Sequence, residues 1–279
     1  MQIMSLFTAL PGAAAQGLIW GIMAIGVYIT FRILDIADLT VDGTLCTGGA
    51  VCIMMMLSGH NVWISMLAAT GAGLLAGFAT GIFHTFMGIP AILAGILTQL
   101  SLYSVNLKIM GKANQAINVD KFNLLVSLRR VKGVSLTQNT LFIVAIMIVI
   151  LIAILYWFFG TELGCSLRAT GCNPSMSRAQ GINTDRNKVL ALMLSNGLVA
   201  LSGALLTQYQ GFADINMGRG SIVIGLAAVI IGEAIFSRIF RNFALKLLSV
   251  VFGSILYYLV LQVVIWMGID TDLLKMLSA

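Results

Sequence analysis

Charged side chains are scarce in this sequence. Lys, Arg, Asp and Glu together make up 9% of the 279 residues, whereas 59% are hydrophobic. A soluble domain carries about 25% charged residues, because its folded surface must interact with water. The shortage of charge excludes an ordinary soluble fold and indicates that lipid is the solvent for most of the chain.

Histidine and cysteine are also few, and they form no recognisable metal site. The chain has two histidines and four cysteines, which are Cys46, Cys52, Cys165 and Cys172. These cysteines show neither a CxxC pair nor the Cys/His spacing of a zinc site, so we expect unpaired packing thiols and no metal. The GxxxxGK[ST] motif is absent as well. The chain therefore has no P-loop for ATP, and any ATPase must be a separate subunit.

Long apolar runs recur from one end of the chain to the other. A helix needs about 20 apolar residues to cross a hydrocarbon core roughly 30 Å thick. The runs are continuous rather than alternating between apolar and polar residues, which favours helices over barrel strands. We predict an all-α, polytopic membrane helix bundle of about eight spans, near residues 11–31, 43–58, 62–83, 90–106, 140–160, 188–210, 221–236 and 244–268. Residues 1–10 lack the basic region of a signal peptide, so we expect the first run to be retained.

The net charge of +6 comes from Lys and Arg residues that lie between the apolar runs. Anionic lipid head groups explain such loop charges, so we expect membrane lipid and no nucleic acid as a partner. The 16 Lys and Arg residues divide equally between the two sides of the predicted bundle. The positive-inside rule therefore does not orient the chain.

Two stretches of the sequence resemble each other. The apolar-Ala-Asp-apolar-polar-apolar pattern of residues 36–41 returns at 212–217, and the pattern of residues 16–19 returns at 196–199. By the span count, the two copies cross the bilayer in opposite directions. We therefore predict one transmembrane domain, residues 1–279, with inverted repeat halves at roughly 11–106 and 188–279. Transporters built from such repeats bind substrate at interrupted helices.

Residues 35–44 fit such an interruption, because three aspartates, two threonines and a glycine lie between two apolar runs. An acid at membrane depth is retained mainly where it faces water or a partner. We predict that the substrate path includes Asp38, Thr40, Asp42, Asp214 and Asn216. The alternative is that both Asp-containing segments are ordinary loops at the membrane surface.

Small residues recur at four-residue spacing in two of the predicted spans. On one helix face such glycines let a neighbouring backbone approach closely. We interpret five of them as helix-packing positions, namely Gly17, Gly21, Gly73, Gly77 and Gly81.

The hydrophilic segment 161–187 carries strong helix punctuation. Asn173 is a good N-cap, Pro174 fits the first helical position and Gly181 suits a left-handed stop. The pattern predicts a helix of roughly two turns, which is too short to be stable alone and should dock on something. Arg168 and Arg178 flank it and could contact an acidic partner or lipid phosphates.

This segment, with the sequences Leu-Ser-Gly-Ala at 201–204, Tyr-Gln-Gly-Phe-Ala-Asp at 209–214 and Ile-Gly-Glu at 231–233, resembles the permease of ABC importers in the branched-chain amino acid and ribose group. The nearest branch is that of tryptophan or tyrosine uptake. The resemblance covers about half of the chain, most strongly 161–236 and also 14–58. It implies that the segment is cytoplasmic and contacts the ATPase through Arg168, Asn173, Pro174, Arg178 and Gly181. We expect Ser175 and Met176 on the same short helix to lie at this contact as well.

The resemblance also implies an assembly in the bacterial cell membrane. It consists of two permeases (a homodimer or a pair), two cytoplasmic ATPase subunits that use ATP and Mg, and an extracytoplasmic substrate-binding protein. This chain would then be a transport subunit and not an enzyme, without a cofactor of its own. The basic loop 105–139 would lie outside the cell, and one further span would be expected after the segment 270–279.

Two other functions compete with the importer. An ion-coupled secondary carrier would bind a proton or sodium at Asp35, Asp38, Asp42 or Asp214, but it leaves the punctuated helix at 173–181 unexplained. An intramembrane enzyme lacks support, because the aspartates show no catalytic motif and Ser221 has no evident His partner.

Overall fold

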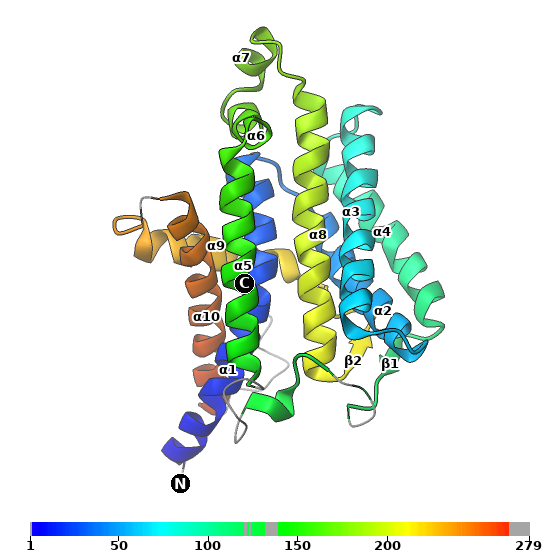
Figure 1. The fold of residues 1–279 in the computed structure, drawn as a ribbon, viewed down its shortest axis with the longest axis vertical. Coiled ribbons are helices and arrows are strands. Elements are labelled where there is room, and N and C mark those ends of the chain that lie inside the picture. The colour runs from blue at the N-terminus through cyan, green and yellow to red at the C-terminus, as the bar shows by residue number, and fades with distance from the viewer. Residues whose placement is uncertain (1, 120–121, 123, 132–138, 241, 268–279) are drawn as a thin grey trace.

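The computed structural model describes residues 2–119, 122, 124–131, 139–240 and 242–267, and they form a helical bundle (Figure 1). In chain order the elements are α1 (Gln2–Tyr28), the π-helical turn η1 (Ile29–Ile33), α2 (Thr40–Leu57), α3 (Val62–Thr85), α4 (Ala91–Met110), β1 (Asn114–Ala116), the 3-10 turn η2 (Leu128–Val131), α5 (Thr140–Gly160), α6 (Glu162–Cys172), α7 (Pro174–Ala179), α8 (Thr184–Gln210), β2 (Phe212–Asp214), α9 (Ser221–Phe236) and α10 (Phe243–Trp266).

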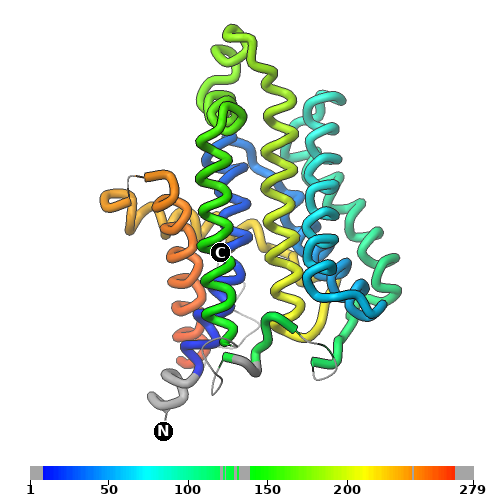
Figure 2. Tube along the Cα trace, in the orientation of Figure 1, coloured from blue at the N-terminus to red at the C-terminus, as the bar shows by residue number. Residues whose placement is uncertain are grey.

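The apolar runs of the sequence are helices, so the predicted all-α membrane bundle is confirmed. Among the described residues, seven segments are long and apolar enough to cross a membrane, namely Ala9–Ile33, Thr40–Leu57, Val62–Thr85, Ala91–Met110, Thr140–Gly160, Thr184–Gln210 and Phe243–Trp266. The remaining predicted span, α9, has only 16 residues. It runs across the direction of α5 and α8 (Figures 1 and 2).

Glycines allow the closest helix contacts in the bundle. A Cβ on Gly73 or Gly77 of α3 would overlap backbone carbonyl oxygens of α8, and one on Gly81 would lie 3.0 Å from the Val189 Cα. On α1, a Cβ at Gly17 would lie 2.8 Å from the Ile255 Cα of α10, and one at Gly21 would lie 3.2 Å from a Val251 methyl group. The two glycine faces therefore join α3 to α8 and α1 to α10 at backbone distance.

Serine hydroxyls reinforce α1 from both sides. Ser195 and Ser202 of α8 donate to the carbonyl oxygens of Gly26 and Ile19, and Ser254 of α10 donates to that of Gly17, each at 2.8 Å. Between membrane helices such bonds are worth about 0.6 to 2 kcal/mol each. They hold α1, which is largely buried, at the centre of the described bundle.

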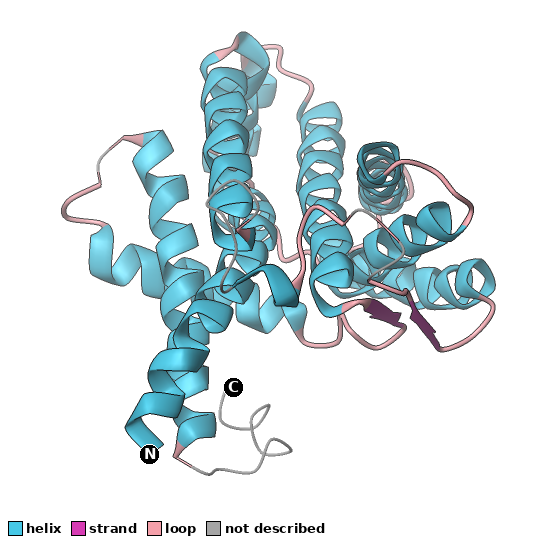
Figure 3. Cartoon of the chain, turned by 60° about the horizontal axis from the view of Figure 1, so that its bottom comes forward, coloured by secondary structure: helices cyan, strands magenta, loops and turns pink. Residues whose placement is uncertain are grey.

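A strand pair and a short helix, α6, were not predicted. The strands β1 and β2 pair antiparallel, with Gln115 opposite Ala213, and form a two-stranded sheet at one end of the bundle (Figure 3). At the opposite end, α6 follows α5 directly and is capped by Thr161, whose hydroxyl accepts from the Gly164 N–H at 3.4 Å (Figure 1). The segment 270–279, after which a further span was expected, lies outside the described residues.

Candidate functional site

The first helix of the bundle is interrupted between η1 and α2, over residues 34–39. Asp35 adopts φ +55°, a left-handed conformation that an Asp tolerates better than most residues. The break is shorter than the sequence predicted, because Asp42, Gly43 and Thr44 already lie inside α2. The side chains of Asp42 and Thr44 bond to groups at helix ends, so these two residues do not disrupt the first turns of α2.

Asp38 lies two residues before α2 and joins the beginning of this helix to α8. One carboxylate oxygen accepts from the Thr40 N–H at 2.9 Å, and the other accepts from the Asn196 side-chain amide at 2.7 Å. The Thr44 hydroxyl completes the cluster by donating to the Asn196 carbonyl oxygen at 2.7 Å. Asp38 is 3% exposed, so the Thr40 N–H and the Asn196 amide, rather than water, satisfy its carboxyl oxygens.

Thr40 extends this polar network away from Asn196. Its hydroxyl lies 2.8 Å from that of Thr80 on α3, which bonds Thr98 on α4 at 2.9 Å. All three threonines are buried. The network ties the beginning of α2 to three neighbouring helices, which gives the interruption a fixed geometry.

Asp42 lies one turn further along α2 and caps a different helix. Its carboxylate accepts from the Gly220 N–H at 2.9 Å, the Ser221 hydroxyl at 2.8 Å and the Ile222 N–H at 3.0 Å. These donors form the beginning of α9, where unsatisfied N–H groups and the helix dipole favour an anion. Asp42 therefore connects the two helices that begin inside the bundle, α2 and α9.

A cavity of about 340 Å³ opens beside Asp42, between α2, α4 and the chain before α9. Its polar lining comes from Asp42, Gln99, Tyr103, Asn106 and Arg219. Asn106 is 1% exposed, and its side-chain carbonyl oxygen has no hydrogen-bond partner among the described residues. A buried acceptor of this kind is costly unless a ligand or water donates to it. The cavity is therefore suited to a small polar ligand.

Of the five residues predicted to line the path, Asp42 lines this cavity. Asp38 and Thr40 belong to the buried network behind it, whereas Asp214 ends β2 and Asn216 follows in the next turn. Asp214 accepts from the Asn216 N–H at 2.7 Å, as Asp38 does from Thr40. The two matching sequence stretches thus form the same Asp-to-second-residue turn, although the inverted repeat as a whole stays a prediction.

These bonds bear on the carrier alternative. Asp38, Asp42 and Asp214 each use both carboxylate oxygens within the protein, Asp214 through the Asn216 N–H and through the Asn114 amide at 3.4 Å. The carboxylates act as acceptors for helix and turn N–H groups, so the structure gives an ion-coupled carrier no specific support.

At the other end of the molecule, the punctuated segment forms α7. The Asn173 side chain accepts from the Met176 N–H at 3.0 Å, Pro174 occupies the first turn and Gly181 has φ +81°. Met176 is 63% exposed. Arg178 bonds the Thr184 hydroxyl at 2.7 Å and pairs with Asp185 at 3.4 Å, which fixes α7 to the beginning of α8.

The neighbouring helix α6 contacts the interruption directly. A Cβ on Gly171 would overlap the carbonyl oxygen of Ile33 and would lie 3.0 Å from the Leu34 Cα. On its other side, α6 is bonded to α8, where the Asn187 amide donates to the Thr170 hydroxyl at 2.8 Å. A displacement of α6 would therefore act on the first residues of the break. This contact was not predicted, because Gly171 matched no packing pattern in the sequence.

The comparison with known proteins supports a transport role. Residues 10–279 match the family described as branched-chain amino acid transport system / permease component. A tyrosine transport system permease protein of Clostridioides difficile (strain R20291) is 37% identical over 264 residues, which cover 95% of this chain and 85% of that protein. An uncharacterized protein of Rickettsia prowazekii (strain Madrid E) is also 37% identical, over 95% of this chain and 92% of its own length.

More distant similarity extends to other importers. The autoinducer 2 import system permease protein LsrC of Escherichia coli (strain K12 / DH10B) is 29% identical over 79% of this chain and 61% of that protein. The family match spans nearly the whole sequence and agrees with the apolar helices of the bundle. This chain is a multi-pass protein of the bacterial cell membrane and belongs to the permease family of branched-chain amino acid transport systems.

Proposed function

We propose that this chain is the membrane-spanning subunit of an ATP-driven importer for an amino acid, with an aromatic amino acid as the first candidate. The observation that supports coupling between the ATPase and the substrate path is the contact of Gly171 on α6 with Ile33 and Leu34 at the helix interruption. The family match and the tyrosine transport relative support the substrate class.

The cavity beside Asp42 is the proposed substrate path. Its volume of about 340 Å³ suits a single amino acid. The exposed Arg219 guanidinium offers paired donors to a substrate carboxylate, and the free Asn106 carbonyl oxygen accepts from an ammonium group. Leu100 and Tyr103 provide apolar surface for the side chain. The path thus recognises both charged ends of a zwitterion.

The α6–α7 segment is the proposed contact with the ATPase. In this assembly a second permease copy pairs with this chain, two cytoplasmic ATPase subunits bind the α7 ends, and an external binding protein delivers the substrate. The partner ATPase binds ATP and Mg. Its closure displaces α7, and the Arg178 bonds to Thr184 and Asp185 pass this movement to the beginning of α8. The Asn187–Thr170 bond then joins α8 to α6. The movement reaches the break through Gly171 and changes access to the cavity.

The decisive experiment is a Gly171→Val substitution in the complete transporter reconstituted in proteoliposomes. The added side chain separates α6 from Ile33, so we expect substrate uptake to fall about tenfold, the loss that corresponds to 1.4 kcal/mol of coupling, while ATP hydrolysis persists. Gly71→Val is the matched control, because Gly71 faces open space within its span. Equal uptake by Gly171→Val and the unaltered transporter would refute the proposed transmission.

The substrate class has its own test. Uptake of L-tyrosine, L-tryptophan, L-leucine and D-ribose is compared in the same proteoliposomes, with Arg219→Gln beside the unaltered chain. We expect uptake of aromatic amino acids and a KM about tenfold higher in Arg219→Gln, since one charge-assisted carboxylate contact is lost. Uptake of ribose with no response to any amino acid would contradict the proposal.

A further inference from the structure

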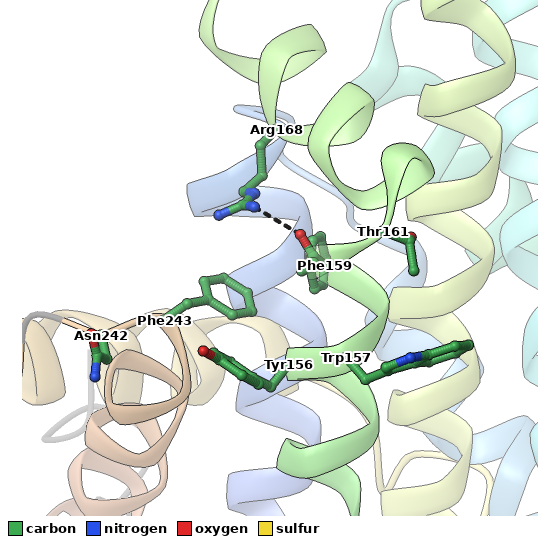
Figure 4. A pocket seen from close by; sticks show the side chains of 8 residues that line it. Tyr156, Trp157, Phe159, Thr161, Arg168, Asn242 and Phe243 are labelled. Carbon is green, nitrogen blue, oxygen red and sulfur yellow. Dashed lines mark hydrogen bonds between the residues drawn. The ribbon is translucent and has the colours of Figure 1, made fainter.

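A second polar region lies at the α6 end of the bundle and plays no part in the proposed path. A cavity of about 550 Å³ lies between the end of α5, α6 and the beginning of α10, and a neighbouring cavity of about 300 Å³ shares Arg168 and Phe243 with it. Figure 4 shows the Arg168 side chain pointing toward the end of α5, with Phe243 and Tyr156 below its guanidinium. We call the two cavities together the Arg168 pocket.

Contacts within the protein hold the guanidinium of Arg168 in place without occupying all of its N–H donors. One amino group of the guanidinium donates to the Phe159 carbonyl oxygen at 2.7 Å. The central carbon of the guanidinium, Cζ, lies 5.6 Å from the centre of the Phe243 ring. These contacts fix its plane and leave further N–H donors directed into the pocket. Although the resemblance placed Arg168 among the ATPase contacts, the structure turns its charge away from α7 and onto α5 and α10.

The charge in the Arg168 pocket is positive. The smaller cavity also receives Lys246 and Arg32, and Glu233 neutralises Arg32 through a 3.0 Å ion pair. No Asp or Glu is among the described residues that line either cavity. Arg168 and Lys246 therefore present two uncompensated charges to whatever occupies the pocket.

The position of the pocket identifies its occupant. The outer face of α5 is apolar and exposed along its length, with Val149 61% and Ile154 59% exposed, and it ends in Tyr156 and Trp157 at 55% and 72%. Aromatic residues at the end of an apolar helix mark the level of the lipid head groups. The phosphate of a lipid at that level contacts Arg168 and Lys246, while the acyl chains of the same lipid extend along α5. We propose that the Arg168 pocket binds the phosphate of an anionic glycerophospholipid.

Native mass spectrometry of the full chain tests this proposal, with phosphatidylglycerol or phosphatidylcholine added to the detergent-solubilised protein. We expect preferential retention of phosphatidylglycerol. Arg168→Gln and Lys246→Gln should each weaken it about fivefold, because each Lys or Arg near a membrane surface contributes about 1 kcal/mol toward anionic lipid. Arg168→Lys, which keeps the charge but loses the planar fork, should lie between Arg168→Gln and the unaltered chain.

The matched control is Arg186→Gln, which removes an exposed charge at the same end of the molecule but outside the pocket. It should retain phosphatidylglycerol like the unaltered chain. Lys246 is exposed, so its substitution tests the site even if Arg168 variants fold poorly. Equal retention of both lipids, an equal loss in Arg186→Gln, or displacement of the lipid by millimolar inorganic phosphate would overturn the assignment. This outcome is independent of uptake and therefore of the proposed function.

Discussion

Asp38 and Asp42 place their carboxylates at the beginnings of two helices inside the bundle. Asp38 caps its own helix α2, whereas Asp42 caps α9 from across the molecule. An anion at a helix N-terminus satisfies N–H groups that have no partner within the helix. This role explains why acids persist between apolar spans.

We expect Asp42→Ala to lower the free energy of unfolding by about 1 to 2 kcal/mol, because three donors at the beginning of α9 lose their acceptor. Unfolding in mixed micelles of increasing SDS content measures this change. Asp214→Ala is the control, since Asp214 accepts from one turn N–H and from the Asn114 amide but caps no helix, and it should cost less. A larger loss in Asp214→Ala than in Asp42→Ala would contradict the capping argument.

The contact between Asp38 and Asn196 permits a double-mutant cycle. Asn196→Ala leaves one buried carboxylate oxygen of Asp38 without its donor at 2.7 Å. The coupling free energy between Asn196→Ala and Asp38→Ala should be about 1 to 3 kcal/mol, the range for a buried bond to a charged group. SDS-induced unfolding of the unaltered chain, the two single variants and the double variant measures this coupling free energy. Additive losses would show that the two side chains are energetically independent.

The α3–α8 pair is held in close contact by small residues. Gly73 and Gly77 place the α3 backbone against carbonyl oxygens of α8, so the interface has no room for a side chain. Lipid provides no hydrophobic force between helices, and van der Waals packing at short distance therefore stabilises the pair. The same helices carry Thr80 and Asn196 of the polar network, whose bonds depend on this spacing.

Gly77→Ala should destabilise the bundle by about 1 to 3 kcal/mol, because its Cβ would overlap the Leu192 carbonyl and force the helices apart. Gly71→Ala on the same helix is the matched control, since nothing lies within 4 Å of its Cβ. It should be neutral or slightly stabilising, as alanine is the better helix former. Thermal unfolding in detergent compares the two, and equal midpoints would exclude close packing as the reason for Gly77.

In the whole molecule, α6–α7 and the β1–β2 pair lie at opposite ends of the bundle (Figure 1). Transmission from an ATPase to the cavity requires the α7 end to face the cytoplasm. The Lys and Arg counts leave this orientation undecided, so it depends on what each end contacts. Ser175 on α7, which is exposed, and Gln115 on β1, which is half-buried, report the two sides separately.

We therefore expect Ser175→Cys, in a background with Cys165 and Cys172 replaced by serine, to cross-link to the ATPase subunit. In intact cells an impermeant thiol reagent should label Gln115→Cys and leave Ser175→Cys unlabelled. Western blotting of the cross-linked species and of the labelled chain reads both results. Labelling of Ser175→Cys from outside would reverse the orientation and remove the importer mechanism with it.

The local features of the chain followed from its sequence. Membrane helices were predictable because a span must be apolar over about 20 residues, and no tertiary partner is needed to make it helical in lipid. The helix α7 was predictable because Asn173, Pro174 and Gly181 act within one or two turns of their own positions. Asp214 ends the strand β2, a place that local polarity alone could not predict.

The tertiary structure alone decided the contacts that form the candidate site. Asp42 meets the Gly220 N–H across 178 residues of sequence, and Asp38 meets Asn196 across 158. The contact of Gly171 with Ile33 and the pairing of β1 with β2 depend on the same long-range packing. Such contacts depend on how spans of similar composition are arranged around each other, and the apolar pattern of each span does not encode that arrangement. The sequence therefore determined that the chain crosses the membrane repeatedly, and packing determined which polar groups meet inside it.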